Sequence, residues 1–252
     1  MWLLNPYRFG RSWTPADITT ALWLDAADTS TITTVNGAVS QWNDKSGNGR
    51  NATQATSADR PVYVASSVNG LPCVEFQATN HILGTSYTLP TSNVYHFDVV
   101  KRLADLGSLG SAFGYQISAN RQFAGFRDNS NLWFGAGSTS LSTVTANSSA
   151  NTAHIFAYQL VGSSTAGLRF NGSIAVSVQV FTGTSGGGTM VVGEGGGTNA
   201  LNSIIGVSER ITVNSSISLS DIEKVEGYLA HKWGLAANLP ADHPFRSAAP
   251  TI

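Results

Sequence analysis

The feature that most constrains the fold is a succession of short apolar segments separated by turn residues, which runs through most of the chain. Some segments alternate apolar and polar residues, as residues 39–43 (Val-Ser-Gln-Trp-Asn) do, and this period of two is typical of a half-buried strand. Asn-Gly pairs, Gly-Gly pairs and Ser/Asn clusters between the segments indicate hairpin turns. So many short strands, with almost no helical period, predict an all-β, two-sheet antiparallel sandwich. The expected strands cover residues 21–25, 39–43, 60–65, 72–77, 94–103, 111–117, 121–127, 131–137, 153–161, 168–180, 188–194 and 201–213.

One α-helix is expected, near the C-terminus. Ser220 is followed three residues later by Glu223, a capping-box spacing that predicts Ser220 as the residue that caps the helix. Gly234 is the expected left-handed stop. Beyond it, the proline-containing tail of residues 235–252 is expected to run extended over the surface. The buried face of the helix is predicted to consist of Ile222, Val225, Leu229 and Trp233.

Length and composition exclude several classes of protein. The 252 residues suffice for one large β-domain, and neither a repeat nor a shift in composition marks a second one. A net charge of −1 excludes a basic nucleic-acid footprint, and no segment approaches the ~20 apolar residues of a membrane span. The single cysteine, Cys73, excludes an internal disulfide framework and is expected to be an inert core thiol. We therefore expect neither nucleic-acid binding nor membrane insertion.

The sequence offers no catalytic constellation. A glycosidase needs two carboxylates on either side of the bond that it cuts, and Glu75 and Glu209 each lack an acidic partner two residues away. There is no Gly-x-Ser-x-Gly elbow, and the five histidines are scattered without a metal-ligand spacing. No catalytic residue is predicted and the chain is expected not to be an enzyme. An enzyme would need an unusual pair, such as Glu75 with Asp44 meeting in a cleft.

Calcium is the one metal that the sequence brings into question. Asp25, Asp28 and Asp44 lie near the first strands, and residues 44–49 (Asp-Lys-Ser-Gly-Asn-Gly) offer several oxygen ligands. This segment is not the twelve-residue loop with a bidentate Glu. The favoured alternative is that these side chains bond turn amides. No metal and no cofactor is predicted.

A sugar-binding site is the remaining candidate. Asp128, Asn131 and Trp133 combine polar groups with an aromatic face, at an expected loop between two strands. Lectin sites use such a mixture, with the ring stacked on a pyranose and the polar groups bonded to its hydroxyls. The alternative is a hairpin turn followed by a core tryptophan.

Several stretches together resemble one family. They are residues 14–28, 39–49, 60–61, 168–172, 225–235 (Val-Glu-Gly-Tyr-Leu-Ala-His-Lys-Trp-Gly-Leu), 238–240 and 242–245. In these motifs the chain resembles the LamG-like (concanavalin A-like) jelly-roll proteins encoded by tailed bacteriophages. The resemblance covers about residues 14–250, although residues 80–165 match in pattern only.

The resemblance implies that residues 14–252 form a jelly-roll domain, with Trp42 and Trp233 in its core. It also implies a place on a phage particle, where such domains occur on tail fibres, receptor-binding proteins and capsid decorations. The expected function is that of a virion structural protein on the particle surface, a tail-fibre or receptor-binding component that binds a host-surface glycan without catalysis. Its expected partners are other virion proteins and further copies of itself. The alternative is a capsid decoration or head spike without a specific glycan site, and a polysaccharide-degrading enzyme is less favoured.

The N-terminal peptide, residues 1–13, lies outside the jelly-roll pattern. It has too many large apolar groups for a free tail, so two interpretations stay open. Either the peptide packs on its own sandwich, or it docks onto a neighbouring virion protein or assembles an oligomer. The residues expected to make the docking contact are Trp2, Leu3, Leu4, Tyr7 and Phe9.

Overall fold

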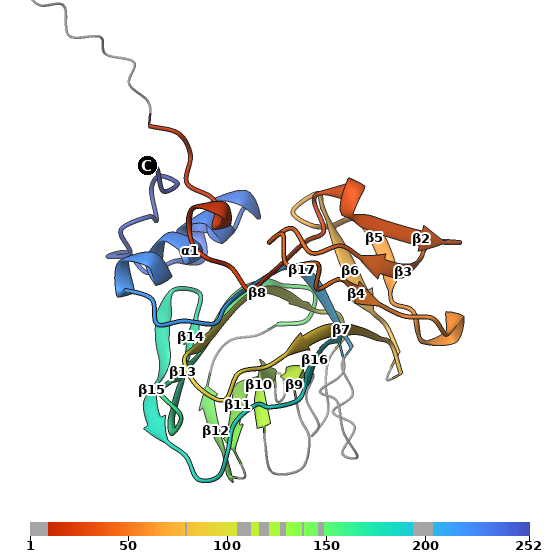
Figure 1. Ribbon diagram of the computed structural model, residues 1–252. Coiled ribbons are helices and arrows are strands. Elements are labelled where there is room, and N and C mark those ends of the chain that lie inside the picture. The colour runs from red at the N-terminus through yellow and green to blue at the C-terminus, as the bar shows by residue number, and fades with distance from the viewer. Residues whose placement is uncertain are drawn as a thin grey trace, which may run out of the picture.

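The computed structural model describes residues 10–78, 80–104, 112–115, 121–126, 130–137, 139–145, 149–193 and 204–252. Figure 1 shows a molecule built mainly of strands, with one α-helix, α1 (Leu219–Lys232), against the outside of a curved layer. Short 3₁₀ helices cover Pro15–Asp17, Thr29–Thr31, Ser57–Asp59 and Ala236–Asn238. The strands are β1 (Leu22–Asp25), β2 (Ile32–Val35), β3 (Ala38–Trp42), β4 (Ala52–Thr53), β5 (Val62–Val68), β6 (Leu71–Phe76), β7 (Ile82–Thr88), β8 (Val94–Arg102), β9 (Ala112–Tyr115), β10 (Arg121–Phe126), β11 (Asn131–Gly137), β12 (Thr139–Thr145), β13 (Ala153–Val161), β14 (Thr165–Phe170), β15 (Ser173–Val180), β16 (Thr189–Gly193) and β17 (Ile205–Val213).

Strand β17 is the centre of the first layer. One of its edges pairs with β8, and the layer continues from β8 through β13 and β14 to β15. The other edge is shared: residues 205–207 pair with β6 and residues 209–212 pair with β1. The second layer runs from β12 through β11, β10, β9, β16, β7, β4 and β3 to β2.

Strands β5 and β6 join the two layers, because β6 pairs with β17 while β5 pairs with both β6 and β3. Every described pair is antiparallel, so the layers form one hydrogen-bonded ribbon that folds over itself (Figure 1). The predicted all-β sandwich of two antiparallel sheets with one C-terminal α-helix is confirmed. Residues 1–9 of the predicted N-terminal peptide lie outside the described residues.

All nine residues of β17 are buried, because the second layer covers one of its faces and α1 covers the other. Thr212 faces the second layer, where it bonds His96, which in turn reaches Gln122 of β10. Glu209 faces α1 and bonds Trp233 just after the helix. Trp42 and Trp233 are completely buried, as expected.

The strand pattern needs one correction. Residues 168–180, predicted as one strand, form β14 and β15, because Asn171 and Gly172 both take positive φ angles (50° and 79°) and turn the chain. Asn and Gly are the residues that adopt this conformation at least cost. The other predicted strands are present with shifted ends, and four further strands (β2, β4, β7 and β12) were not predicted.

The helix is present, but it begins earlier than predicted. Ser218 caps it, with its Oγ accepting a hydrogen bond from the Asp221 amide at 3.1 Å, so the assignment of Ser220 as the cap is wrong. Ser218 lies two residues before the predicted cap and satisfies the amide of Asp221, which belongs to the true first turn of the helix. The four predicted apolar residues are buried, and Gly234 ends the helix region with φ +68°.

The C-terminal tail packs more closely than predicted. Leu239 and His243 are buried, and a Cβ on Gly227 would lie 2.4 Å from Phe245, so the tail lies directly against α1. The tail also pairs with the first described residues, since Ser12 bridges Thr251. The two ends of the described chain therefore meet beside α1 (Figure 1). The proposed domain boundary between residues 13 and 14 stays a prediction.

Among the described residues, no helix is both long and apolar enough to cross a membrane.

Candidate functional site

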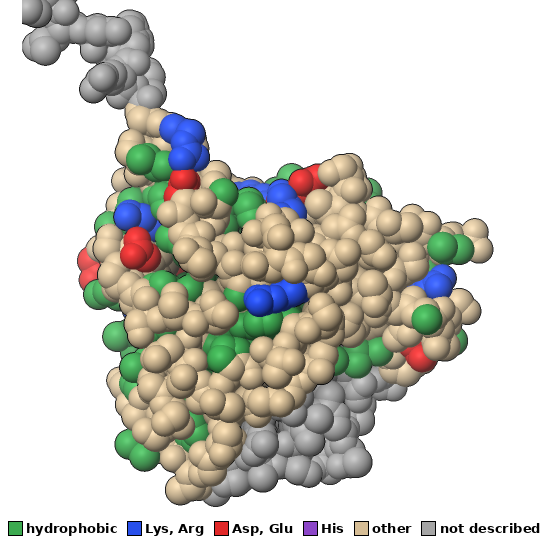
Figure 2. Space-filling model, viewed as in Figure 1, with side chains coloured by type: hydrophobic (Ala, Val, Ile, Leu, Met, Phe, Trp, Pro, Cys, Tyr) green, Lys and Arg blue, Asp and Glu red, His purple; other side chains and the backbone are tan. Residues whose placement is uncertain are grey.

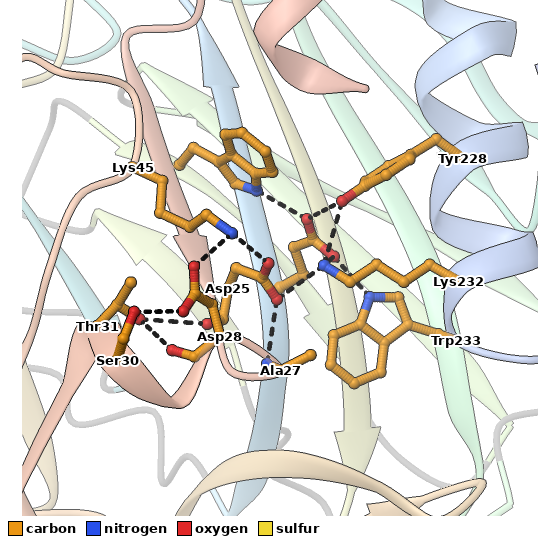
Figure 3. A network of polar contacts seen from close by, with 11 residues as sticks. Asp25, Ala27, Asp28, Ser30, Thr31, Lys45, Tyr228, Lys232 and Trp233 are labelled. Atoms are coloured by element: carbon orange, nitrogen blue, oxygen red, sulfur yellow. Dashed lines mark hydrogen bonds and ion pairs between the residues drawn. The ribbon is translucent and has the colours of Figure 1, made fainter. Parts of the chain in front are cut away.

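A buried polar network joins α1 to the sheet. Asp25 of β1 lies directly opposite Glu209 of β17, and both carboxylates contact Lys232 of α1, so they lie on the face that the helix covers. Figure 3 shows Lys232, from the last turn of α1, between them, with its Nζ 2.7 Å from an oxygen of each. Glu209 also accepts hydrogen bonds from Trp23 Nε1 (2.7 Å) and Trp233 Nε1 (2.6 Å). Each of these donors belongs to a motif on which the family resemblance rests.

A second lysine, Lys45, adds another positive charge to this network. Lys45 lies 2.8 Å from Asp25 and 2.9 Å from Asp28. Burial opposes the charge of Lys45, but its bonds to the two aspartates outweigh burial and raise its pKa. Burial raises the pKa of Glu209, and Lys232 works against that shift. The network thus holds three carboxylates with two ammonium groups.

Glu209 lacks an acidic partner two residues away, as the sequence shows, but it has an acidic neighbour in space, Asp25, which comes from another strand. Asp25 and Glu209 are both buried, are bonded to Lys232, and line none of the described pockets. We assign the network a structural role, holding α1 on β1 and β17.

A second buried ion pair holds the middle of the helix on the sheet. Arg169 donates from Nε to Glu226 at 2.7 Å and from its Nη2 to the same carboxylate at 2.8 Å. His243 Nε2 lies 3.3 Å from Glu226, which brings the tail into the same cluster. The carboxylate of Glu226 is completely buried and faces the sheet. The helix is therefore held by buried charges at its middle and in its last turn.

The remaining acidic and sulfur candidates have protein partners. Asp44 accepts from the amides of Trp23, Ser46 and Arg50, so it organises the turn. Glu75 accepts from Ser67 and Gln77 and lines none of the described pockets, and neither does Asp44. Burial raises the pKa of the Cys73 thiol to about 12. In the parts of the chain that the structure describes, no three His, Cys, Asp or Glu side chains gather as a metal site requires.

The best candidate binding site is a groove lined by amides and hydroxyls, which we call the polar groove. Its larger part has a volume of about 310 Å³ and lies where the β5–β6 turn, the end of β8, the start of β13 and the segment after α1 meet. Its smaller part, of about 250 Å³, shares Thr152 and Asn238 with the first and extends to the β14–β15 turn. The polar lining consists of Ser67, Asn69, Lys101, Ser149, Asn151, Thr152, His154, Asn171 and Asn238.

The local backbone explains why asparagines line the polar groove. Asn69, Asn151 and Asn171 all have positive φ angles (49°, 61° and 50°), and each lies in a turn between strands or just before one. Asn adopts this conformation more readily than other non-Gly residues, so the turns themselves place amides at this end of the sandwich. Asn69 is used in the fold, because its Nδ2 donates to the carbonyl of Trp233 at 2.7 Å.

Other groups of the polar groove remain available to a ligand. The exposed side chains of Asn151, Thr152 and Asn238 make no hydrogen bond within the described residues. Lys101 contacts Ser67 only, at 3.2 Å from its carbonyl oxygen and 3.1 Å from its Oγ. Lys101 is the one Lys or Arg among the groove's described lining residues, and Glu75, which bonds the same Ser67 hydroxyl from behind the groove, offsets part of its charge. Charged side chains are sparse on the face seen in Figure 2, which is consistent with only 12% charged residues.

The sugar site predicted from the sequence stays a prediction. Asn131 is half-buried at the start of β11, opposite Thr145. Asp128 and the side chain of Trp133 lie outside the described residues, and so do the predicted docking residues Trp2, Leu3, Leu4, Tyr7 and Phe9. The polar groove was missed because its residues come from five separate segments. The only signal for it in the sequence is the repeated Asn at expected turns.

No protein-family model and no curated protein sequence matches the chain. Solved structures do match. The sialidase of Trypanosoma rangeli in complex with sialic acid is 13% identical with a TM-score of 0.54, over 85% of this chain and 33% of that one. The binding domain of Paraclostridial Mosquitocidal Protein 1 is 11% identical with a TM-score of 0.59, over 85% and 53%. The ligand-binding domain of botulinum neurotoxin serotype D in complex with N-acetylneuraminic acid is 12% identical with a TM-score of 0.58, over 84% and 52%.

This chain spans about one third to one half of the length of these proteins. At such low identity the similarity shows a shared fold, the β-sandwich, and not a shared activity. The sandwich part of the expected resemblance is therefore supported. None of these three structures is a phage protein, and no family model supports the LamG-like assignment.

Proposed function

We propose that this protein binds a carbohydrate and does not cut it. The observation that carries the proposal is the polar groove, in which Asn151, Thr152 and Asn238 offer free amide and hydroxyl groups beside Lys101. Sugar hydroxyls both donate and accept hydrogen bonds, and an amide side chain can do the same with a single ligand. A groove rich in such groups, with little apolar lining, suits a hydrophilic ligand better than a hydrophobic cofactor.

Lys101 favours an acidic sugar. Its ammonium group bonds no carboxylate directly, because the Ser67 hydroxyl stands between it and Glu75, so a ligand carboxylate would supply a charge-assisted hydrogen bond. The comparisons agree with this choice, because one protein of similar fold was solved in complex with N-acetylneuraminic acid. The described lining contains no exposed aromatic ring, so a single site is expected to bind weakly. Several copies on one particle would gain avidity.

The proposal excludes catalysis on the basis of the described carboxylates. Asp25 and Glu209 are bonded to Lys232, Glu226 is bonded to Arg169, and Glu75 lies behind Ser67. A glycosidase requires two carboxyl groups about 5–10 Å apart on either side of a sugar. No two described carboxylates line the polar groove, which leaves binding as its activity.

We also propose that the protein lies on the surface of a phage particle, as a tail-fibre or other receptor-binding component. This part is supported by the family resemblance of the sequence motifs, and the polar groove, if it binds glycans as proposed, would provide the binding site that a receptor-binding component needs. The alternative is a capsid decoration that binds no specific glycan. Antibody labelling of purified particles tests the location, and particles that carry no label would contradict it.

Binding to an array of acidic and neutral glycans tests the activity. The full chain, clustered on a carrier to restore avidity, is expected to bind acidic glycans. Asn151→Ala with Asn238→Ala removes two ligand bonds of about 1 kcal/mol each, and binding should fall roughly 10- to 30-fold. Asn214→Ala, at an exposed site outside the groove, is the matched control and should bind normally.

The outcomes of this experiment are distinct. No binding to any glycan, with the clustered full chain and an unchanged circular dichroism spectrum, overturns glycan binding and favours the decoration role. Binding that the double variant retains overturns the polar groove as the site. It would direct attention to Asp128, Asn131 and Trp133. Binding of neutral glycans that Lys101→Met leaves unchanged keeps the site but overturns the acidic ligand.

A further inference from the structure

A second groove, of different chemistry, lies at the opposite end of α1. It has a volume of about 390 Å³ and an apolar lining that includes Ile174, Leu219, Pro240 and Pro244. Ile174 is 63% exposed and Leu219 is 58% exposed. Neighbouring large apolar side chains that are exposed together often mark an interaction surface. We call this feature the docking groove. It does not depend on the proposed glycan binding.

The docking groove continues along an open sheet edge. Strand β15 begins beside it and pairs with β14 on one side only, among the described strands. Val178 and Val180 are exposed on this strand, and hydrophobic side chains reach the surface at the left of Figure 2, where Figure 1 places β15. Natural edge strands are commonly protected by charged residues or proline, and β15 contains neither, although two register shifts twist it against β14. Such an edge can accept an added strand.

The rim of the docking groove is acidic. Glu223 and Asp242 both line it, and neither forms an ion pair within the described residues. Arg169 also lines the groove, where its guanidinium is bonded to Glu226 and interacts electrostatically with Glu223, so it offsets part of this negative charge. The site therefore fits an extended peptide that combines large apolar side chains with a positive charge.

The chain itself contains such a peptide. Residues 1–9 (Met-Trp-Leu-Leu-Asn-Pro-Tyr-Arg-Phe) are mainly apolar, carry Arg8 and contain no acidic residue. We propose that residues 1–9 of a second copy bind along β15 as an added antiparallel strand. In this orientation Arg8 meets Glu223 and Asp242, and the apolar residues cover Ile174 and the exposed valines.

Chain length favours a second copy over the same copy. Pairing along β15 uses about as many residues as the eight in that strand, so one of the nine residues remains to span any gap. One residue reaches only about 3.3–3.6 Å. Gly10 is held at the C-terminus, since a Cβ there would lie 2.3 Å from the carbonyl oxygen of Ile252, and Ser12 pairs with Thr251 rather than with β15. A second copy has no such limit, because its Gly10 can lie at any distance from the Gly10 of the copy that supplies β15.

Sedimentation equilibrium of the full chain with charge-swap variants tests the proposal. The full chain should associate, Arg8→Glu should weaken association about tenfold or more, and Glu223→Arg should do the same. The combination of Arg8→Glu with Glu223→Arg should restore much of the association. Asp59→Arg makes the same change of charge outside the docking groove and should leave association unaffected.

Each other outcome overturns the proposal. A full chain that stays monomeric at all concentrations shows that no second copy binds. Association that Arg8→Glu leaves unchanged shows that a different surface is used. If the double variant does not recover association, Arg8 does not pair with the acidic rim. Val178→Asp adds a charge to the open edge without touching the core, and should also weaken association. Circular dichroism of every variant separates these outcomes from loss of fold.

Discussion

At the scale of single residues, His154 shows how a buried polar group can be left with an unpaired donor. Its ring lies between Phe126 and Phe170, with ring centroids 5.9 Å and 4.7 Å away. Asn171 Oδ1 accepts from the Ile155 amide, so its Nδ2 donates to His154 Nδ1. The proton of the neutral ring is then on Nε2, which is buried and has no partner within the described residues. Burial, with Arg102 nearby, lowers the pKa of His154 to about 4.

This pKa makes stability depend on pH. The unfolded chain takes up a proton at His154 below about pH 6.5, while the folded chain does so only near pH 4. Above pH 6.5 the neutral His154 does not lower the free energy of unfolding. As the pH falls from 6.5 toward 4, that free energy decreases by about 1.4 kcal/mol per pH unit. His154→Phe should flatten the slope of unfolding free energy between pH 6.5 and 5 by that amount, measured by urea denaturation. An unchanged slope would mean that His154 is protonated in the folded protein.

At the scale of elements, the buried charges decide how firmly α1 is held. Lys232→Met removes the cation between Asp25 and Glu209 and leaves two buried carboxylates facing each other. Breaking a buried pair in this way typically costs about 3–5 kcal/mol. Lys224→Met on the same helix removes only an exposed pair with Asp221, which is worth less than about 1 kcal/mol. Thermal unfolding of both variants checks the difference, and equal losses would show that Lys232 does not carry the docking of α1.

The elements were predictable where pattern and turn chemistry agreed. Strands such as β8 and β13 are long and apolar, and the helix has a clear buried face. Strands β2 and β12 (Ile-Thr-Thr-Val and Thr-Ser-Leu-Ser-Thr-Val-Thr) were missed because their residues also suit loops, and only pairing with β3 and β11 makes them strands. The helix cap was misplaced because two serines, at 218 and 220, both fit the start of the helix.

At the scale of the whole molecule, the sequence cannot reveal which distant segments meet. The motif residues Asp25, Lys45 and Lys232 were noticed as a pattern, yet the place of Glu209 beside Asp25 and Lys232 follows only from the register of β1 with β17. The polar groove is harder still, because it joins turns that lie more than 160 residues apart, such as those at Asn69 and Gly234. Fold class can be predicted from local sequence patterns. A site that packing forms from distant segments depends on the topology, which those patterns do not contain.

The two ends of the chain provide a test of that packing. The Trp13 amide donates to the Pro250 carbonyl at 3.0 Å, the Ile252 amide donates to Arg11 at 3.0 Å, and Trp13 packs edge-on against Tyr228 of α1. Deletion of residues 250–252 removes both hydrogen bonds and uncovers Trp13, which should cost about 1–3 kcal/mol and speed hydrogen exchange at Trp13 by tenfold or more. Ile252→Ser keeps the backbone pairing and alters only a 62%-exposed side chain, so its exchange should match the full chain. If Trp13 remained equally protected after the deletion, α1 alone would hold the N-terminal segment, and the pairing of the two ends would contribute nothing to the anchor from which residues 1–9 extend.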